Sequence, residues 1–492
     1  MKHRKRPVAL ATALIIALAS VSSLAQEKLD RTKQPTPGPN PVLRVPTWTK
    51  TQLANGATLI VSERRGLPLI SFNITFLGGS NQFEPASKRG VAAMTTSMLT
   101  EGTKTKTGDE LSDALQLLGT SINANVFGEE GTVNFVSSTK NFDATLALLA
   151  DMMLNSTFPA EALERLRART LVNLTQAKDQ PAVIGSQVFS KILYSEAHPY
   201  GQRTTEASVK AITRDDVMAF QKAYFQPGRA IITVVGDITS LKAKASVEKG
   251  LAAWPKAGDK PSFEYPKLPA LQPAKIYLVD KPGSAQSIFN IGLPGPARNT
   301  PDYFALQVMN TILGGMFQSR LNANIREQKG YSYGVNSSFS YGKGPGAFRA
   351  GGAIFSGKTD AALIEFMKEL KGIIGERPIT DEEIKTAKDS LIQRLPQVFS
   401  SVTGTSNAIT SLVVQGLPDD YYQTYAKNVS AVTKEDLLRV AKRYIDLNHL
   451  AIVIVGDRAT IEAPLKATGI APITIVDLEG NPAGGAVSTS SN

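Results

Sequence analysis

Apolar positions along the chain follow two different periods. Short apolar runs at residues 59–61 and 69–76 predict β-strands, and the short turn between them favours a hairpin. Residues 144–154 and 161–177 instead carry apolar side chains at helical spacing, which predicts two helices. This mixture predicts an α+β fold in which antiparallel sheets carry helices on one face.

One segment of the chain occurs twice. Residues 209–237 align without a gap with residues 429–457, and 10 of the 29 paired positions are identical. Each copy predicts a helix followed by an apolar strand that ends in Val-Gly-Asp. Thr213 and Thr433 are natural N-caps, because an Asp follows each of them by three residues. The chain therefore contains an internal repeat.

The segments in front of the two copies also correspond. Residues 57–74 match residues 274–291, and the distance along the chain between these segments is nearly the same as that between the two copies. We therefore expect two homologous halves. The expected boundaries are a signal peptide at 1–25, an extended leader at 26–44, an N-terminal half at 45–255, a linker at 256–273, a C-terminal half at 274–479 and a flexible tail at 480–492.

The segment 1–25 has the layout of a secretory signal. Basic residues precede an apolar run at 8–19, and Ser23-Leu24-Ala25 offers a small-x-small cleavage site. The run is shorter than the roughly 20 residues that a membrane-spanning helix needs. No other stretch is long and apolar enough to span a bilayer. We therefore expect an exported, periplasmic protein without a membrane span once the signal is removed.

The composition narrows the possible chemistry. The 492 residues are 42% hydrophobic and 20% charged, which is typical of globular protein and long enough for more than one domain. The absence of cysteine excludes disulfides, thiol catalysis and cysteine-ligated zinc. The net charge of +11 is scattered rather than clustered, so nucleic acid is not an expected partner. Apart from His3 in the signal, the only histidines are His198 and His449, one in each half.

Several short motifs occur in a characteristic order along the chain. They are Leu53-Ala-Asn55-Gly56, Gly78-Gly79-Ser80, Gly90-Val91-Ala92, Gly102-Thr103, His198-Pro199-Tyr200-Gly201, Tyr224 to Pro227, Leu313-Gly314-Gly315, Ser319-Arg320-Leu321, Arg326-Glu327 and Gly330-Tyr331-Ser332-Tyr333. In this order the chain resembles the pitrilysin/insulinase zinc metallopeptidases, in particular their processing-protease branch. The resemblance covers nearly the whole chain after the signal.

The zinc motif of that family is not present. Active members carry His-x-x-Glu-His, in which two His one helical turn apart bind zinc and the Glu acts as general base. The two His positions read Ala93 and Ser97 here, the Glu position reads Thr96, and the third-ligand position falls near Asn173. Because none of these side chains is an effective zinc ligand, the resemblance implies no catalytic residues and no metal in this chain. The apolar face of the helix is retained at Val91, Met94 and Met98.

Other residues of the C-terminal half match substrate-binding positions of the family. The resemblance assigns Arg326 to holding substrate carbonyls and Tyr333 to donating a hydrogen bond to the oxyanion of the tetrahedral intermediate. It also suggests that Gly314 and Gly315 allow close approach of the substrate backbone. Alternatively, Arg326 is a surface ion-pair partner, Tyr333 packs beside Tyr331 on one strand face, and the glycines end a helix that begins at Thr300.

The resemblance implies a division of labour between two chains. We expect a non-catalytic, substrate-binding subunit of a heteromeric periplasmic zinc metallopeptidase that acts on peptides or unfolded proteins. Its two halves would form half of a clam-like chamber, and the zinc would belong to a partner that carries His-x-x-Glu-His. The alternative is a peptide-binding or scaffold protein of the same fold without a proteolytic role. An independent enzyme is disfavoured, because the sequence supplies no other cluster of metal ligands or nucleophile motif.

Overall fold

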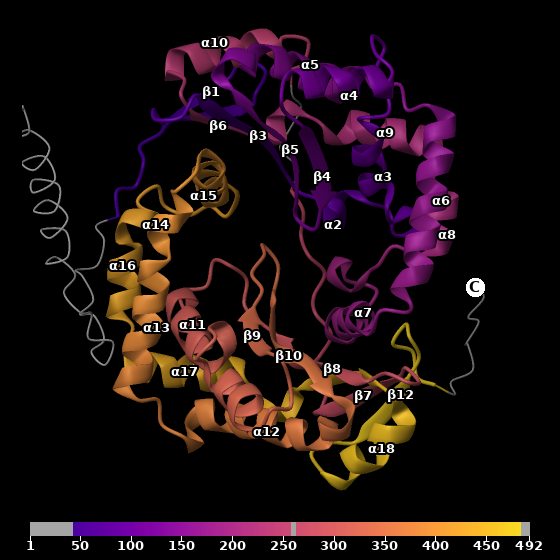
Figure 1. Cartoon of the computed structure of the whole chain (residues 1–492), viewed down its shortest axis with the longest axis vertical. Coiled ribbons are helices and arrows are strands. Elements are labelled where there is room, and N and C mark those ends of the chain that lie inside the picture. Colours follow the sequence, from indigo (N-terminus) through magenta and orange to yellow (C-terminus); the bar gives the residue numbers. More distant parts are fainter. Residues whose placement is uncertain (1–42, 257–261, 484–492) are drawn as a thin grey trace, which may run out of the picture. The chain divides into compact units, whose positions relative to one another are not determined.

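The computed structural model describes residues 43–256 and 262–483, and within them it contains two six-stranded sheets (Figure 1). The expected signal peptide, and most of the expected leader and tail, lie outside the described residues. The first sheet has the order β1-β2-β6-β3-β5-β4, with β1 (Thr49–Gln52), β2 (Thr58–Glu63), β3 (Leu69–Leu77), β4 (Ile122–Phe127), β5 (Glu130–Ser138) and β6 (Ala230–Gly236). The second has the order β12-β7-β11-β8-β10-β9, with β7 (Lys275–Asp280), β8 (Gln286–Pro294), β9 (Val335–Phe339), β10 (Ala347–Phe355), β11 (Ala451–Gly456) and β12 (Ile473–Val476).

The sheet topology confirms the predicted α+β fold with two homologous halves. Five strands follow the same order in both sheets, and only the sixth differs, β1 in one sheet and β12 in the other. The predicted hairpin between β2 and β3 is wrong, because β6 lies between them, parallel to β2 and antiparallel to β3. Every residue of β6 is buried, which suits a strand in the interior of a sheet that is covered on both faces. The sheets are consequently mixed rather than purely antiparallel.

Helices accompany each sheet. Those of the N-terminal half are α2 (Ser80–Phe83), α3 (Val91–Met98), α4 (Gly108–Leu117), α5 (Phe142–Asn155), α6 (Ala160–Ala177), α7 (Pro181–Tyr194), α8 (Glu206–Ala211), α9 (Arg214–Tyr224) and α10 (Ser240–Gly250). Those of the C-terminal half are α11 (Tyr303–Asn310), α12 (Thr359–Lys371), α13 (Asp381–Gln393), α14 (Leu395–Val398), α15 (Val402–Val414), α16 (Tyr421–Ala431), α17 (Lys434–Tyr444) and α18 (Arg458–Ala467). The predicted helices at 144–154 and 161–177 correspond to α5 and α6, and Thr213 and Thr433 cap α9 and α17 as expected.

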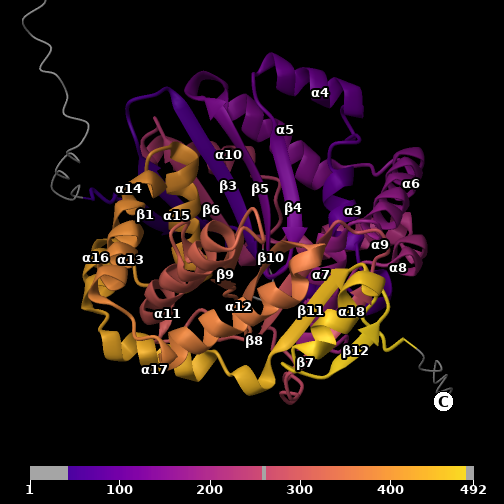
Figure 2. The ribbon, with the colours of Figure 1, turned by 60° about the horizontal axis from the view of Figure 1, so that its bottom comes forward.

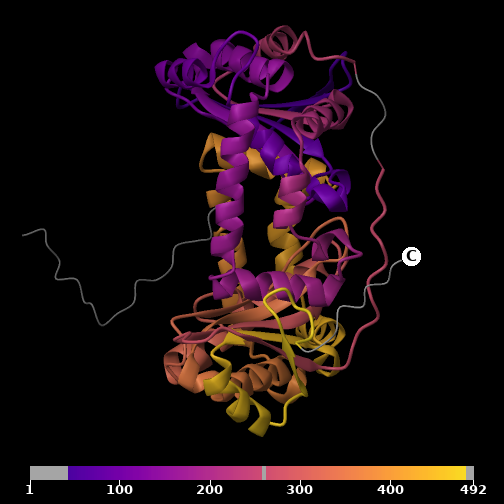
Figure 3. The same cartoon turned by 90° about the vertical axis from the view of Figure 1, so that its right-hand side faces the viewer.

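The two halves exchange one helix each. α7 leaves the N-terminal half and packs on β8 and β11 of the second sheet, whereas α15 packs on β3 and β6 of the first (Figures 1 and 3). Val188 of α7 lies among Val453 and Val455, and Ile409 of α15 lies against Ile231 and Val235. The expectation of helices on a single face is therefore incomplete, since the second face of each sheet is covered by a helix from the other half.

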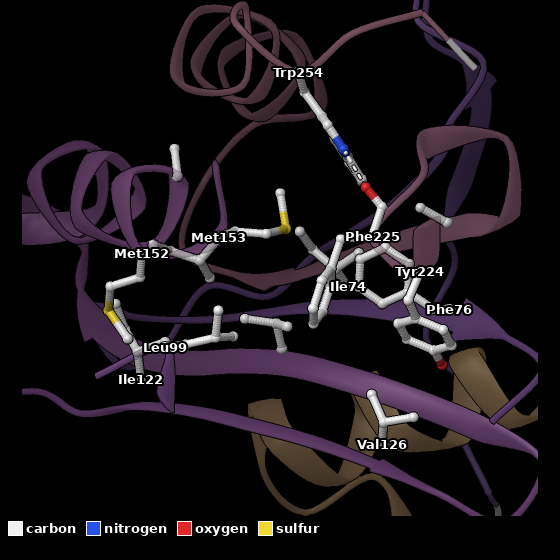
Figure 4. Packing of buried hydrophobic residues seen from close by; sticks show 14 of the residues in the cluster. Ile74, Phe76, Leu99, Ile122, Val126, Met152, Met153, Tyr224, Phe225 and Trp254 are labelled. Atoms are coloured by element: carbon white, nitrogen blue, oxygen red, sulfur yellow. Dashed lines mark hydrogen bonds between the residues drawn. The ribbon is translucent and has the colours of Figure 1, made fainter. Parts of the chain in front are cut away.

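The core of the N-terminal half is rich in aromatic side chains (Figure 4). Phe76 of β3 contacts the rings of Tyr224, Phe225 and Trp254, with centroids 5.6, 5.1 and 6.0 Å away. The Trp254 indole N–H donates to the Phe225 carbonyl at 2.8 Å, which ties the end of this half to its core. In the described part of the chain, no helix is long and apolar enough to span a membrane.

Candidate functional site

Helix α3 presents the degenerate zinc motif to solvent. Val91, Met94 and Met98 are buried in the core, as their spacing predicted, whereas Ala93 and Ser97 are exposed on the opposite side, one turn apart. A helix of this orientation would hold two metal-binding side chains at these positions in solvent. Here the same surface carries only a methyl group and a hydroxyl.

The other two positions of the motif are equally unsuited to a metal. Thr96 is buried, and its hydroxyl donates to the backbone carbonyls of Ala92 and Ala93 at 3.2 and 3.0 Å. Asn173 is exposed on α6, a helix that contacts α3. Within residues 43–256 and 262–483, no three His, Cys, Asp or Glu side chains lie close enough to hold a metal ion. The described residues at these four motif positions therefore do not supply the ligands that a zinc ion needs.

A buried carboxylate fixes the start of α3. Glu84 accepts hydrogen bonds from the backbone N–H groups of Gly90 and Ala92, at 3.0 and 2.8 Å, and lies 3.3 Å from the Arg89 guanidinium. Burial raises the pKa of Glu84, although these N–H groups and Arg89 counteract the shift. This network pairs two of the N–H groups at the helix terminus with a carboxylate, which fixes where α3 begins.

Introducing zinc-binding side chains tests the placement of the motif positions on α3 and α6. We expect the double variant Ala93→His/Ser97→His to bind zinc in isothermal titration, because the two imidazoles would share one exposed helix face. Adding Asn173→Glu should tighten binding by about tenfold, equivalent to about 1.4 kcal/mol. The matched control is Gln176→Glu, one helical turn further along α6. Equal effects of the two glutamates would contradict the placement of the third-ligand position at Asn173.

The two histidines make local contacts in separate places. His198 is buried between the rings of Tyr194 and Tyr265, and its Nδ1 accepts the Tyr200 N–H at 3.1 Å. Desolvation lowers the pKa of His198, so the ring is neutral at physiological pH. His449 lies 2.6 Å from the Asp446 carboxylate. Among the residues that the structure describes, neither histidine joins a group of metal ligands.

Arg326 stands on a π-helical segment, Asn322–Gln328, in the C-terminal half. Its guanidinium lies 4.1 Å from the centre of the Phe317 ring and 3.3 Å from the Glu327 carboxylate. The segment is held to the sheet because the β9 residue Val335 donates its N–H to the Asn322 side chain at 3.0 Å. Arg326 is half-buried, so its fork retains N–H groups that face solvent.

Tyr333 lies two residues before β9, the last strand of its sheet. The side chain is 82% exposed, and its ring meets the edge of Phe355 at a centroid distance of 5.5 Å. Its hydroxyl makes no hydrogen bond to any described residue. Tyr331 instead packs on the core of the C-terminal half. The two tyrosines therefore do not pack alike, and the Tyr333 hydroxyl is open to a ligand.

Gly314 and Gly315 end the helical turn Thr311–Gly315, which follows α11 directly. The predicted end of this helix is confirmed. A Cβ on Gly314 would collide with the backbone nitrogen of Ser337 in β9. The missing side chain at Gly314 therefore lets the helical turn lie close against strand β9. Gly315 is exposed.

Two aromatic neighbours of this site were not found from the sequence. Phe317 lies under Arg326 and Phe355 lies beside Tyr333, and both are exposed apolar side chains. The only sequence signal was the position of Phe317 directly after the glycine pair and Met316. No sequence signal indicated Phe355, because it is distant from Tyr333 along the chain. The two residues meet because β10 pairs with β9.

Comparisons with known proteins point to one family. The model "Insulinase (Peptidase family M16)" matches residues 63–203, and the model "Peptidase M16 inactive domain" matches residues 211–391. An uncharacterized zinc protease of Bacillus subtilis is 24% identical over 68% of this chain and 81% of its own length. A protein of Helicobacter pylori described as a non-peptidase homolog is 22% identical over 81% of this chain and 92% of its own.

Solved structures show the same fold. A peptidase M16 inactive domain from Pseudomonas fluorescens has a TM-score of 0.76 and 26% identity, covering 83% of this chain and 98% of that chain. The periplasmic protease PqqL from Escherichia coli has a TM-score of 0.71 and 18% identity, covering 89% of this chain and 50% of that chain. This chain thus spans about half the length of PqqL.

Proposed function

Because the chain belongs to peptidase family M16 and lacks the zinc-binding residues of that family, we propose that it is the substrate-binding subunit of a two-chain zinc peptidase. The partner is a homologue that carries His-x-x-Glu-His and holds the metal. The substrates are peptides or unfolded chains.

The contrast between the two halves supports this proposal. The position of the zinc motif on α3 carries Ala93 and Ser97, which offer no metal ligand. Arg326 and Tyr333 nevertheless remain accessible on one short stretch of the C-terminal half. The exposed tyrosine with an uncommitted hydroxyl is available to a ligand, which a scaffold role would not require.

The chemistry of the pair suits peptide hydrolysis on a neighbouring chain. The Arg326 fork can donate two hydrogen bonds to substrate carbonyls, while the Phe317 ring beneath it limits its orientation. The Tyr333 hydroxyl can donate to the oxygen that becomes negatively charged as water attacks the peptide carbonyl. Zinc in the partner would activate that water.

We also place the subunit in the periplasm. The N-terminal segment has the order of a secretory signal. The similar fold of PqqL, described as a periplasmic protease, is consistent with that location.

A scaffold role is the second candidate. The Helicobacter pylori relative described as a non-peptidase homolog resembles this chain over most of its length. In that case Arg326 and Tyr333 would only stabilise a surface, and their replacement would leave any associated peptidase unchanged.

Co-purification with a zinc-motif homologue tests the proposal. We expect a stable complex in which metal analysis finds zinc only when the partner retains both motif histidines. A partner with both histidines changed to alanine is the matched control, and it should still associate while zinc is lost. Stoichiometric zinc in this chain purified alone, or no association with the homologue, would refute the proposal.

A further inference from the structure

A tyrosine-rich cavity of about 440 Å³ lies in the C-terminal half, away from Arg326 and Tyr333. Most of its lining residues come from α11, α13, α14, α15 and α16. α11, α13 and α16 contact one another, and Figure 2 shows these helices close together. The tyrosines that line it are Tyr303, Tyr341, Tyr421, Tyr422 and Tyr425. This volume falls in the range of about 300–1,000 Å³ that is usual for small-ligand pockets.

Arg298 is the buried charge of this cavity. The residue is only 8% exposed, and its guanidinium stacks 3.4 Å from the centre of the Tyr303 ring. Its Nη2 donates to the Tyr421 hydroxyl at 3.1 Å. No Asp or Glu is among the described residues that line the cavity, so no carboxylate there neutralises Arg298. A buried guanidinium without a counter-ion is costly, which favours an anionic ligand.

A second cation and an unused donor strengthen this preference. Arg394, an exposed residue just after α13, also lines the cavity. The Tyr341 hydroxyl is buried there, has no hydrogen-bond partner of ordinary geometry among the described residues, and lies near the Gln307 side chain. Burial raises the pKa of Tyr425 to about 12 and raises that of Tyr421 as well, so these phenols stay neutral donors.

The aromatic rings suit a flat apolar group but not a cation. Tyrosine faces can attract ammonium ions, yet Arg298 already occupies the face of Tyr303, and Arg394 adds a further positive charge. The aliphatic part of the lining consists of Leu391, Leu395, Val398 and Leu417. The cavity therefore combines two positive side chains and phenolic donors with an apolar wall.

We infer that this cavity binds a carboxylate carried by an aromatic or similar apolar group, with Arg298 holding the carboxylate and the tyrosine rings enclosing the apolar part. Two sources supply this chemistry, the free carboxyl end of a peptide with an aromatic last residue and a small free aromatic acid. The inference does not depend on the proposed peptidase role, because its residues are distinct from Arg326 and Tyr333.

Calorimetric titration of the full chain with matched ligands tests the inference. The probes are 3-phenylpropionate, its neutral amide, and a tetrapeptide ending in phenylalanine, used as the free acid and as the C-terminal amide. At least one acid should bind at least ten times more tightly than its amide, because the charged partner of Arg298 is lost in the amide. Preference for the peptide acid would identify a peptide end, and equal or better binding of phenylpropionate a small acid.

Variants separate binding from folding. Arg298→Gln should weaken the acid at least tenfold, whereas Arg458→Gln, at a half-buried position on α18 outside this cavity, should not change binding. If Arg298→Gln does not fold, Tyr341→Phe and Arg394→Gln provide the same test, since each removes one polar contact and should weaken the acid several-fold. Equal affinity for acids and amides, no binding of either acid, or full affinity in the folded variants would overturn the inference.

Discussion

The Tyr333→Phe variant is expected to lower the peptide turnover of the assembled two-chain complex by about 100- to 1,000-fold, the usual cost of removing one oxyanion donor. The side chain is 82% exposed, its ring meets the edge of Phe355, and its hydroxyl bonds to no described residue, so the fold does not depend on that hydroxyl. The measurement is kcat for a fluorogenic peptide, combined with size-exclusion chromatography of the complex.

Tyr331→Phe is the matched control for this experiment. Tyr331 lies two residues away but packs on the core of the C-terminal half, so loss of its hydroxyl should leave turnover within about twofold. Unchanged turnover in Tyr333→Phe, or an equal loss in both variants, would remove the assigned role of the Tyr333 hydroxyl. A complex that no longer assembles would instead assign Tyr333 to the interface.

The Phe76→Ala variant is expected to lower the free energy of unfolding by about 3–5 kcal/mol, as is typical for a large buried aromatic residue. Phe76 is 0% exposed and contacts three other aromatic rings of the N-terminal core (Figure 4). Such a core cannot close around the vacated volume, because Trp254 and Tyr224 are both fixed by hydrogen bonds to backbone carbonyls.

The free energy of unfolding is measured by chemical denaturation, and Phe127→Ala is the control variant for Phe76→Ala. Phe127 ends β4 and is 76% exposed, so its loss should change the free energy of unfolding by less than about 0.5 kcal/mol. Similar destabilisation by the two substitutions would show that the aromatic cluster around Phe76 does not carry the stability of this half.

Local signals predicted the repeated elements well. The N-caps Thr213 and Thr433 depend on residues three positions away, and both form capping boxes in the structure. The pairing of strands was harder to predict. The apolar run at 230–236 identifies a buried strand, but nothing in the run indicates that it inserts between β2 and β3. That position depends on contacts between segments that are far apart along the chain, such as Phe72 with Val234.

The exchange of helices shows a second limit of sequence reasoning. The apolar faces of α7 and α15 indicate burial, but helical spacing does not say which sheet covers them. Their partners come from the opposite half of the chain. Because the two halves are homologous, both sheets have similar apolar faces, and the sequence alone does not distinguish them.

The candidate site was predictable only in part. The helical period correctly separated the exposed positions Ala93 and Ser97 from the buried face of α3. The neighbours of Arg326 and Tyr333 were not predictable. Phe355 ends β10 and meets Tyr333 because β10 pairs with β9, whereas Phe317 meets Arg326 through the fold of the loop and helical segment between the glycine pair and β9.

The most direct test of the central claim is the peptide turnover of a zinc-bearing homologue measured with and without this chain. The proposed division of labour predicts that neither chain alone cleaves the peptide appreciably, and that mixing them raises turnover by at least about 100-fold. The increase should disappear when this chain carries both Arg326→Ala and Tyr333→Phe. Equal turnover with and without this chain, in a mixture shown to contain the complex, would contradict the account.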